Sequence, residues 1–388
     1  MSPTVAQRPY SASAACYGVL LVSFSKHSHQ RNFVPLYLRH PHIRVVGVTD
    51  DVDVSPQQRA VNVQWANDLD VPYVEGVERG LELDDVDIVS IGCEIERRAA
   101  VAELAALAGK HLWIDKFLGA TVAECDSVVA AVVDAGVSAI VPSYAYGELV
   151  RRSRKVLDDG QIGELLGVHV DIMFSKGWPR PIPEGDRDRP FLPPGRWKFP
   201  DIKRELLTVG AYAIGLIQAC CGPIRQVYGH AGAFFFPEHA ALGAEDFGTL
   251  TMVDDGGRTA SLCAGRIGVA TDAMGGPSRA WLVGTEGSAL VDVRQPAIHA
   301  MVRRQIVEAD YAPTADDPMQ WASGPPLLGA PIRPDAGLAE GLEDLVNAID
   351  EGRSPHYSVR QARDNMEILI AGYRSIVGGT PVALPLSV

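Results

Sequence analysis

The sequence predicts a two-domain α/β protein: an N-terminal doubly wound parallel (Rossmann) sheet, then a domain on an open, mostly antiparallel sheet. Its 388 residues exceed what one hydrophobic core usually supports. From Cys16 to Pro142, short β-branched apolar runs alternate with longer segments of helical period, which is typical of a parallel sheet with crossover helices. After Val141 the strands follow one another with few helices between them, which indicates a second domain.

The first domain is expected over residues 15–141, after a flexible tail at residues 1–14. We expect its strands at Tyr17–Ser23, Ile43–Thr49, Pro72–Val74, Ile88–Gly92, His111–Ile114 and Ala139–Pro142. Helices are expected near Arg31–Arg39, Ser55–Leu69, Arg97–Ala108 and Val122–Ala135. Ligands of such sheets bind beyond the carboxyl ends of the strands, so candidate binding residues are sought there.

The second domain is expected over residues 142–388, and whether its terminal helix packs back on the first domain stays open. Strands are expected at Leu165–Phe174, Gln226–Phe234, Gly248–Val253, Thr259–Ala264, Ala280–Gly284 and Ala289–Val293. Helices are expected at Gly147–Asp158, Leu206–Cys220, Leu338–Glu351 and Ser358–Val377. The stretch Gly177–Asp201 is too rich in proline for a regular element, and is either a substrate loop or a surface excursion.

Composition excludes several classes of function. The 35 basic against 48 acidic residues give a net charge of -13, which disfavours nucleic acid and anionic membranes as partners. The six cysteines lack zinc-site or disulfide spacings, and no signal peptide or membrane span is apparent, so a cytoplasmic protein is expected. The pairs His27/His29 and His40/His42 lack matching ligands, so they are expected at helix ends and in loops and no metal site is predicted.

Four motifs resemble the glucose-fructose oxidoreductase and inositol dehydrogenase (Gfo/Idh/MocA) family, along nearly the whole chain. Ala108–Phe117 is similar to the family's AGKHVLCEKP strand, and Asp158–Glu164 matches its GxIGE turn. Leu206–Tyr212 resembles the LLDxGxH or LMDIGxY helix, and Trp281–Ser288 the GTxGS hairpin. The resemblance implies a nicotinamide-dependent enzyme for sugars, inositols or related diols. It also implies a homo-oligomer, a dimer or tetramer, formed through the C-terminal sheet.

The resemblance also implies catalytic roles for Lys116, Tyr212 and Thr208. Lys116 matches the lysine that reaches the nicotinamide and the substrate hydroxyl. Thr208 and Tyr212 are four residues apart, so they project from one face of a helix. A phenol can exchange a proton near neutral pH if a cation such as Lys116 stabilises its phenolate. Thr208 stands where the family has an aspartate.

The phosphate-binding loop departs from the family. Its Gly-x-Gly-x-x-Gly is replaced by a glycine-free stretch, which should push the phosphates outward or change the turn. The stretch still offers candidate phosphate ligands: hydroxyl donors, a cation, an imidazole and a helix N-terminus. The loop residues expected to hold the cofactor are Ser23, Ser25, Lys26, His27 and Ser28.

Further cofactor contacts are expected at the ends of later strands. Asp50 closes the second strand, where a carboxylate accepts the ribose hydroxyls, and Asp51 follows it; this pair favours NAD over NADP. The TPNxxH loop and the Glu-Lys-Pro motif of the family are altered here, and their positions supply Cys93, Glu94, Arg98 and Asp115 as candidates. Candidate substrate contacts are Tyr144, Trp178, Arg196, Trp197 and Lys198, which offer aromatic faces and charges to a polar ring.

Three functions remain open at this stage. The first is an NAD-dependent dehydrogenase or reductase in which Lys116 and Tyr212 handle the proton. The second keeps NAD as a prosthetic group for elimination, hydrolysis or epimerisation without net redox change. The third, favoured by the glycine-free loop, is a cofactor-free enzyme or binding protein on the same scaffold.

Overall fold

The computed structural model describes residues 16–26, 28–142, 147–174, 177–187, 203–268, 276–292 and 336–387. The chain divides into two compact units. The first lies within residues 1–143 and 337–363, and the second within 144–336 and 364–388. Residues 337–363 thus cluster with the N-terminal unit, and the boundary expected at residue 141 stays a prediction.

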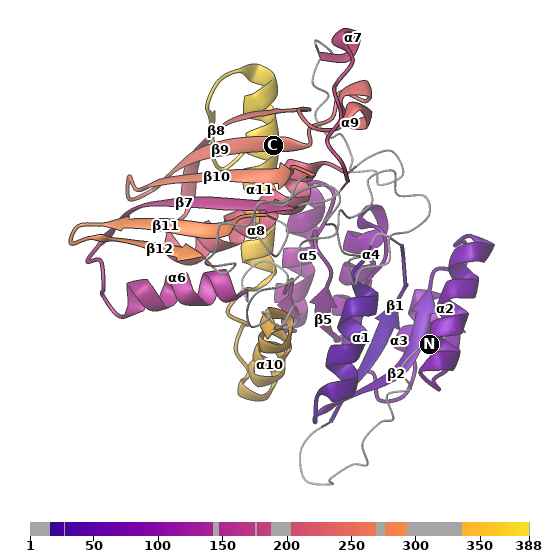
Figure 1. Cartoon of the computed structure of the whole chain (residues 1–388). Helices are drawn as coiled ribbons and strands as arrows, with labels where there is room; N and C mark the ends of the chain where they lie inside the picture. Colours follow the sequence, from indigo (N-terminus) through magenta and orange to yellow (C-terminus); the bar gives the residue numbers. More distant parts are fainter. Residues whose placement is uncertain are drawn as a thin grey trace, which may run out of the picture. The chain divides into compact units, whose positions relative to one another are not determined.

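The first unit is built on a six-stranded parallel sheet in the order β3-β2-β1-β4-β5-β6. Its strands are β1 (Tyr17–Val22), β2 (Ile43–Asp50), β3 (Tyr73–Glu75), β4 (Ile88–Ile91), β5 (His111–Ile114) and β6 (Ala139–Ile140). Its helices are α1 (Gln30–Arg39), α2 (Pro56–Asp68), α3 (Val77–Leu81), α4 (Ile95–Leu107) and α5 (Val122–Ala135), visible in Figure 1. The order confirms the predicted doubly wound fold, with the switch point between β1 and β4.

Local sequence signals set the ends of these helices. The Ser55 hydroxyl accepts a hydrogen bond from the backbone of Gln58 at the start of α2, and Thr121 caps α5 in the same way. Gly136 ends α5 in the left-handed conformation. In the core, the buried Trp113 of β5 meets the rings of Phe33 and Tyr37 edge-on, which packs α1 against the sheet.

The second unit is built on a seven-stranded sheet in the order β12-β11-β7-β10-β9-β8-β13. Its strands are β7 (Leu165–Phe174), β8 (Ile224–Gly232), β9 (Phe247–Asp254), β10 (Thr259–Arg266), β11 (Ser278–Gly284), β12 (Ser288–Asp292) and β13 (Val382–Ala383). Strands β7 and β10 are parallel and the other neighbouring pairs are antiparallel, as predicted. The later helices of the chain are α6 (Glu148–Asp158), α7 (Glu184–Arg187), α8 (Glu205–Cys220), α9 (Pro237–Ala241), α10 (Ala336–Glu351) and α11 (Val359–Gly378).

Helices cover one face of the second sheet, and the other face carries exposed and half-buried side chains. Helix α8 packs on β7, β9 and β10, and Gly372 of α11 approaches Leu250 of β9, so both helices lie on one face (Figure 1). On that face, paired residues form a buried apolar row of Leu250, Leu262, Val170, Ala280 and Val291. On the other face, a cross-strand row of exposed or half-buried residues runs Leu290, Trp281, His169, Ser261, Thr251 and Tyr228.

Short elements account for most differences from the predicted pattern. Sequence patterns did not predict α3, α9 or the two-residue β13, because elements this short carry too few residues for a period to emerge. The described part of the Gly177–Asp201 stretch contains the single helical turn α7, so the expectation of no regular element there is wrong. The remaining bounds differ from the predicted ones by a few residues at most.

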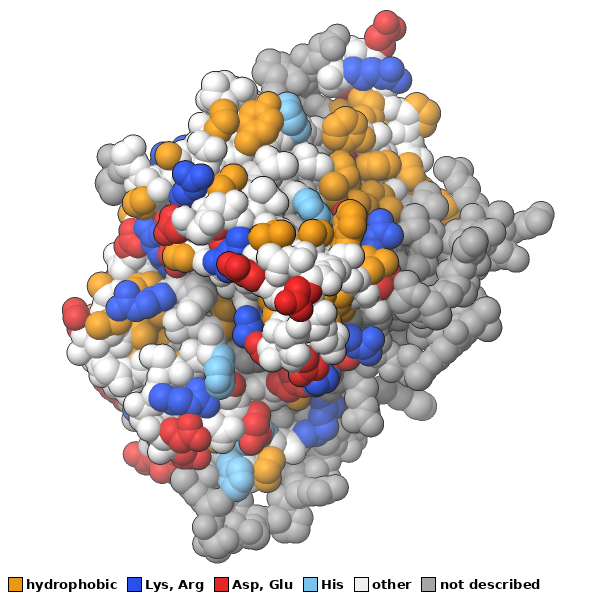
Figure 2. Space-filling model, turned by 90° about the vertical axis from the view of Figure 1, so that its left-hand side faces the viewer, with side chains coloured by type: hydrophobic (Ala, Val, Ile, Leu, Met, Phe, Trp, Pro, Cys, Tyr) orange, Lys and Arg blue, Asp and Glu red, His pale blue; other side chains and the backbone are white. Residues whose placement is uncertain are grey.

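The surface carries charged side chains of both signs. Figure 2 shows a face of the molecule on which basic and acidic side chains are interspersed, with hydrophobic side chains in small groups between them. Among the described helices, none is long and apolar enough to cross a membrane.

Candidate cofactor and catalytic site

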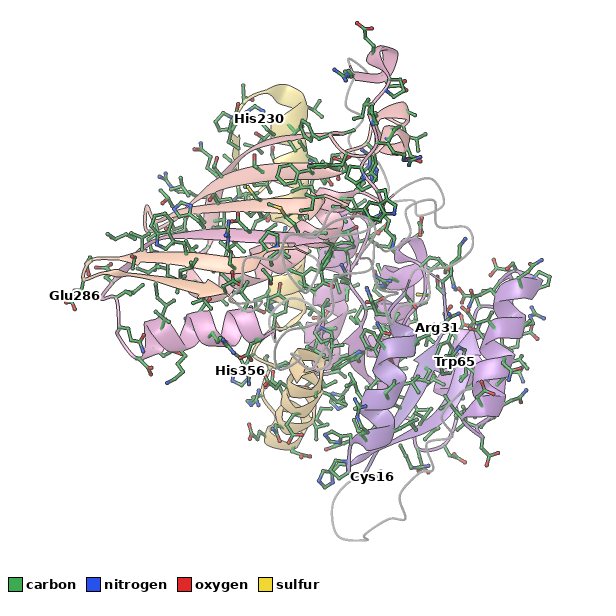
Figure 3. All side chains as sticks on the ribbon, in the orientation of Figure 1. Cys16, Arg31, Trp65, His230, Glu286 and His356 are labelled. Atoms are coloured by element: carbon green, nitrogen blue, oxygen red, sulfur yellow. The ribbon has the colours of Figure 1, made fainter. Side chains whose placement is uncertain are left out.

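The loop between β1 and α1 keeps a tight turn without glycine. Ser23 adopts the left-handed conformation, with φ of 64°, that glycine usually supplies. The side chains of Ser23, Phe24 and Ser25 are buried, and Phe24 stacks in parallel on Trp65 of α2 with 4.6 Å between ring centroids (Figure 3 labels Trp65). The loop therefore turns these side chains into the protein, and Lys26 and Ser28 remain at its outer edge.

Asp115, directly after β5, binds the start of α1. One carboxylate oxygen lies 2.8 Å from Nδ1 of His29, and the other accepts the His29 backbone N–H at 2.9 Å. Burial alone raises the pKa of Asp115, but the charge and hydrogen bonds of His29, together with the charge of Arg98, outweigh burial and lower this pKa to about 2. Asp115 is thus ionised at neutral pH and ties the end of β5 to the N-terminus of α1.

Lys116 lies in a segment held from two sides. Its backbone N–H donates to Asp115 at 2.8 Å, and its Nζ lies 5.4 Å from the centre of the Phe117 ring. The Arg98 guanidinium donates to the Phe117 carbonyl at 2.7 Å and to the Cys93 carbonyl at 2.8 Å. The peptide bond between Lys116 and Phe117 is cis. Arg98 therefore joins the β4–α4 turn to the lysine segment through main-chain contacts.

Two sequence candidates in this region are closed off from solvent. Cys93 is fully buried, and burial raises the pKa of its thiol to about 12. Arg98 is buried as well. Both side chains are buried among protein groups, and their role in binding the cofactor stays a prediction.

Asp50, at the end of β2, is engaged by protein groups. It is fully buried, with one oxygen accepting from Arg97 at 2.9 Å and from the Asp51 backbone at 3.0 Å, and the other from Asn62 at 2.8 Å. Arg97 also pairs with Asp51 and, at 2.6 Å, with Glu94. The side chains of Asp51 and Glu94 are about one third exposed. These two carboxylates therefore form the solvent-facing side of the network, and Asp50 forms its buried side.

Arg97 and His29 are the contributors that sequence reasoning missed. Arg97 was expected only as the first residue of a helix, and His29 as a helix-end histidine, which it is, since it caps α1. The only signal for Arg97 was its place in a run of charges, Glu94 to Arg98, after a buried strand. For His29 the sequence held no signal, because its partner lies 86 residues away.

In the second unit, α8 carries Thr208 and Tyr212 on one face. The Tyr212 ring meets the ring of Phe174, the last residue of β7, edge-on with 6.3 Å between centroids. Trp178 is half-buried. The candidates His27, Tyr144, Arg196, Trp197 and Lys198 lie outside the described residues.

The described residues of the first unit fit a dinucleotide. The β1–α1 loop makes its tight turn through the left-handed Ser23. Lys26 and Ser28 are accessible to a phosphate, and the partly exposed Asp51 can accept hydrogen bonds from ribose hydroxyls. In the described ranges, no group of three or more His, Cys, Asp or Glu side chains is placed to hold a metal ion. A doubly wound domain with such a site, followed by a mixed-sheet domain, defines a nicotinamide-dependent oxidoreductase.

Family models agree with this class. Residues 24–143 match the model described as an oxidoreductase family with an NAD-binding Rossmann fold, and residues 150–290 match the GFO/IDH/MocA C-terminal domain. Together they span about two thirds of the chain. The chain belongs to the Gfo/Idh/MocA family of oxidoreductases, and it is a dehydrogenase or reductase with an NAD-binding domain.

Individual relatives are distant. A 1-carboxy-3-chloro-3,4-dihydroxycyclohexa-1,5-diene dehydrogenase of Comamonas testosteroni is 27% identical over 138 residues, which cover 35% of this chain and 33% of that protein. A putative myo-inositol dehydrogenase of Sinorhizobium meliloti 1021 shares 17% identity, with a TM-score of 0.69 over 95% of this chain and 99% of that chain. The WlbA dehydrogenase of Bordetella pertussis, solved with NADH and UDP-GlcNAcA, shares 17% identity with a TM-score of 0.68, over 96% and 100%.

Proposed function

We propose that the protein is an NAD-dependent oxidoreductase that transfers hydride between the nicotinamide and a carbinol or ketone of a sugar, polyol or related cyclic hydroxylated compound. The observation that carries this is Lys116, a nearly buried lysine directly after β5 whose segment is anchored by Asp115 and Arg98. Burying a lysine ammonium costs free energy of folding, so a buried lysine indicates a functional role. The relatives support the substrate class, because two of them are named for dehydrogenation of a cyclic diol and of myo-inositol, and a third was solved with a sugar nucleotide.

Proton transfer is assigned to Lys116 and Tyr212. Bound NAD supplies the hydride acceptor for oxidation, and its reduced form the donor for reduction. Oxidation also requires that the hydroxyl proton leave, and the neutral amine of Lys116 or the phenolate of Tyr212 can accept it, whereas the ammonium or the phenol can return it in reduction. Thr208, one turn before Tyr212, offers a hydroxyl on the same helix face to orient the substrate.

The cofactor contacts follow from the first unit. Lys26 and Ser28, at the outer edge of the loop, together with the N-terminus of α1, are assigned to the phosphates. Asp51 is assigned to the ribose hydroxyls, and Asp50 supports it through their shared Arg97. A ribose 2′-phosphate would meet the carboxylates of Asp51 and Glu94, which favours NAD over NADP.

The setting proposed for the enzyme is cytoplasmic, because all six cysteines are free thiols. A homo-oligomer is proposed as well, formed through the open face of the second sheet, where Trp281 and Leu290 are exposed.

The proposal is tested by titrating NADH and NADPH into protein stripped of nucleotide, using calorimetry. Micromolar or tighter binding of NADH, weakened at least tenfold by Lys26→Ala with Ser28→Ala, supports it. Arg39→Ala, in the last turn of α1, serves as control. A long-wavelength absorbance band that persists after desalting would instead support NAD as a prosthetic group. If neither dinucleotide binds the wild type, the redox assignment fails.

A further inference from the structure

A second set of charged side chains lies where α8 begins and β10 ends. Arg266 closes β10 and pairs with Glu205, the first residue of α8. Lys203 precedes α8, and His239 belongs to α9, where its Nε2 lies 3.1 Å from the Lys203 carbonyl. Arg266 is only 3% exposed, and Glu205 and His239 are buried too. No role in the proposed function draws on this cluster.

Hydrogen bonding within the cluster is incomplete. Among the residues that the structure describes, Nε and Nη1 of Arg266 are buried without an acceptor, even though the guanidinium is paired with Glu205. Nδ1 of His239 is also buried without a partner in that part of the chain. Since a carbonyl only accepts, Nε2 of His239 carries the proton and Nδ1 is an acceptor. Within the part of the chain that the structure describes, Nε and Nη1 of Arg266 therefore lack an acceptor, and Nδ1 of His239 lacks a donor.

The positive groups of the cluster, Arg266 and Lys203, share the carboxylate of Glu205 as countercharge. Burial and the charge of Arg266 lower the pKa of Lys203, although Glu205 opposes them. Burial, and next the charge of Arg266, lower the pKa of His239 to about 3, so this imidazole is neutral. The nearby carboxylate of Asp246 already accepts the backbone N–H groups of Phe234, Phe235 and Phe236. An anionic oxygen would offset the charge that burial disfavours.

The cluster lies beside the face of α8 that carries the proposed catalytic pair. Glu205, Thr208 and Tyr212 are spaced by three and four residues, so they share that face. Arg266 is paired in register with Phe174, whose ring contacts Tyr212. Glu205 and Tyr212 are separated by about 10 Å along the helix axis, at 1.5 Å per residue. One substrate molecule can therefore extend from Tyr212 to Arg266.

We propose that Arg266, assisted by Lys203, binds a carboxylate of the substrate, and that His239 accepts a hydrogen bond from a neighbouring hydroxyl. The enzyme then prefers hydroxylated acids to neutral polyols. This inference rests on the proposed function, because it names the substrate class of the same enzyme. Charge-assisted hydrogen bonds to a buried arginine give discrimination of roughly tenfold or more between an acid and its neutral counterpart.

The test compares matched probes by calorimetry, with and without saturating NADH. The pairs are quinate against myo-inositol, and D-glucuronate against D-glucose. We expect at least one acid to bind tenfold or more tightly than its neutral partner. Arg266→Gln should abolish this preference, and Lys203→Met should reduce it several-fold. Arg279→Gln removes a half-exposed arginine paired with Asp171 on β7 of the same sheet, and should leave the preference unchanged.

Each outcome decides the matter. Equal binding of both members of each pair, or a preference that survives Arg266→Gln, overturns the carboxylate site. If no acid binds while NADH does, the cluster holds only water and the dinucleotide function stands. If NADH fails to bind, the proposed function fails. The titrations without NADH still measure whether the acids bind more tightly than their neutral partners. Should Arg266→Gln fail to fold by circular dichroism, Lys203→Met, which keeps the Glu205–Arg266 pair, carries the test.

Discussion

The carboxylate of Asp115 holds His29 by two hydrogen bonds, one from the backbone N–H at 2.9 Å and one with Nδ1 at 2.8 Å. Because Asp115 is ionised, Nδ1 of His29 carries a proton and donates it to the carboxylate. The imidazole is 39% exposed, whereas the carboxylate is fully buried. One buried charge thus fixes both the start of α1, whose N-terminus is assigned to the cofactor phosphates in the proposal, and the backbone of Lys116.

Acid stability should depend on Asp115. Its pKa in the folded protein, about 2, lies below the ordinary value of 3.8. The stabilisation is therefore complete above pH 4 and is lost as the pH falls through 2, and it amounts to roughly 2 kcal/mol. Urea unfolding of the wild type and Asp115→Asn between pH 2 and 6 measures it. The variant should lose stability at pH 6 and show a shallower decline toward pH 2.

A matched control for this experiment is Asp126→Asn. Asp126 pairs with Arg363, but half of its side chain is exposed, so its loss should cost less than about 1 kcal/mol. Equal effects of the two substitutions would contradict the role given to Asp115.

Cofactor selectivity should respond to Asp51. In Asp51→Asn, one of the two exposed carboxylates around Arg97 becomes neutral, so the arginine has more positive charge to offer a 2′-phosphate. We expect the affinity for NADPH relative to NADH to rise roughly three- to tenfold, as a partly exposed charge pair allows. Fluorescence titration with both reduced dinucleotides measures the ratio. Asp53→Asn, in the exposed turn after β2, should leave it unchanged, and an unchanged ratio in Asp51→Asn would remove Asp51 from the ribose site.

The catalytic assignment makes Tyr212→Phe informative. Removal of one hydroxyl should lower kcat by about a hundredfold or more, with NADH affinity unaltered, since general acid-base groups contribute on that scale. Tyr228→Phe, on the open face of the second sheet, is the control. A kcat within twofold of the wild type would exclude Tyr212 from proton transfer.

The free energy of unfolding should fall as the pH rises toward 7 and Glu245 ionises. Burial raises the pKa of this carboxyl to about 7, although Arg204 and the Tyr373 hydroxyl oppose the shift. The folded state therefore binds more protons than the unfolded state between about pH 4.5 and 7, and stability declines with rising pH in that window. The slope contributed by one group is at most about 1.4 kcal/mol per pH unit.

Chemical denaturation at pH 5, 6, 7 and 8 measures that slope. Glu245→Gln should make the dependence shallower, and the part that remains is expected from Asp246, whose pKa burial raises to about 6. Glu238→Gln, which removes a half-exposed partner of Arg180, should leave the slope as in the wild type. A wild-type stability that does not fall between pH 5 and 7 would show that Glu245 is not protonated in the folded protein.

The sequence predicted the long elements well because each carries several periods of its own pattern. Helix α5 and strand β7 agree with the expected bounds at both ends. The phosphate loop was harder, because a left-handed serine and the Phe24–Trp65 stack depend on a helix more than 30 residues away. The ion pairs of Arg97 with Asp50 and of Arg266 with Glu205 join residues that no local pattern relates. Such side chains acquire their surroundings only from the tertiary fold.

The open face of the second sheet makes the oligomer testable. Trp281 is 51% exposed and stands between Leu290 and His169 in the cross-strand row, a placement that favours burial against another copy. In a two-fold assembly each copy contributes the same patch, so a charge introduced there is repeated and repels itself. Trp281→Asp should therefore convert an oligomer into monomers, by analytical ultracentrifugation, with the circular dichroism spectrum retained. Leu107→Asp places the same charge at an exposed leucine of α4, and should leave the sedimentation of the wild type unchanged. A wild type that sediments as a monomer at micromolar concentration would contradict assembly through this face.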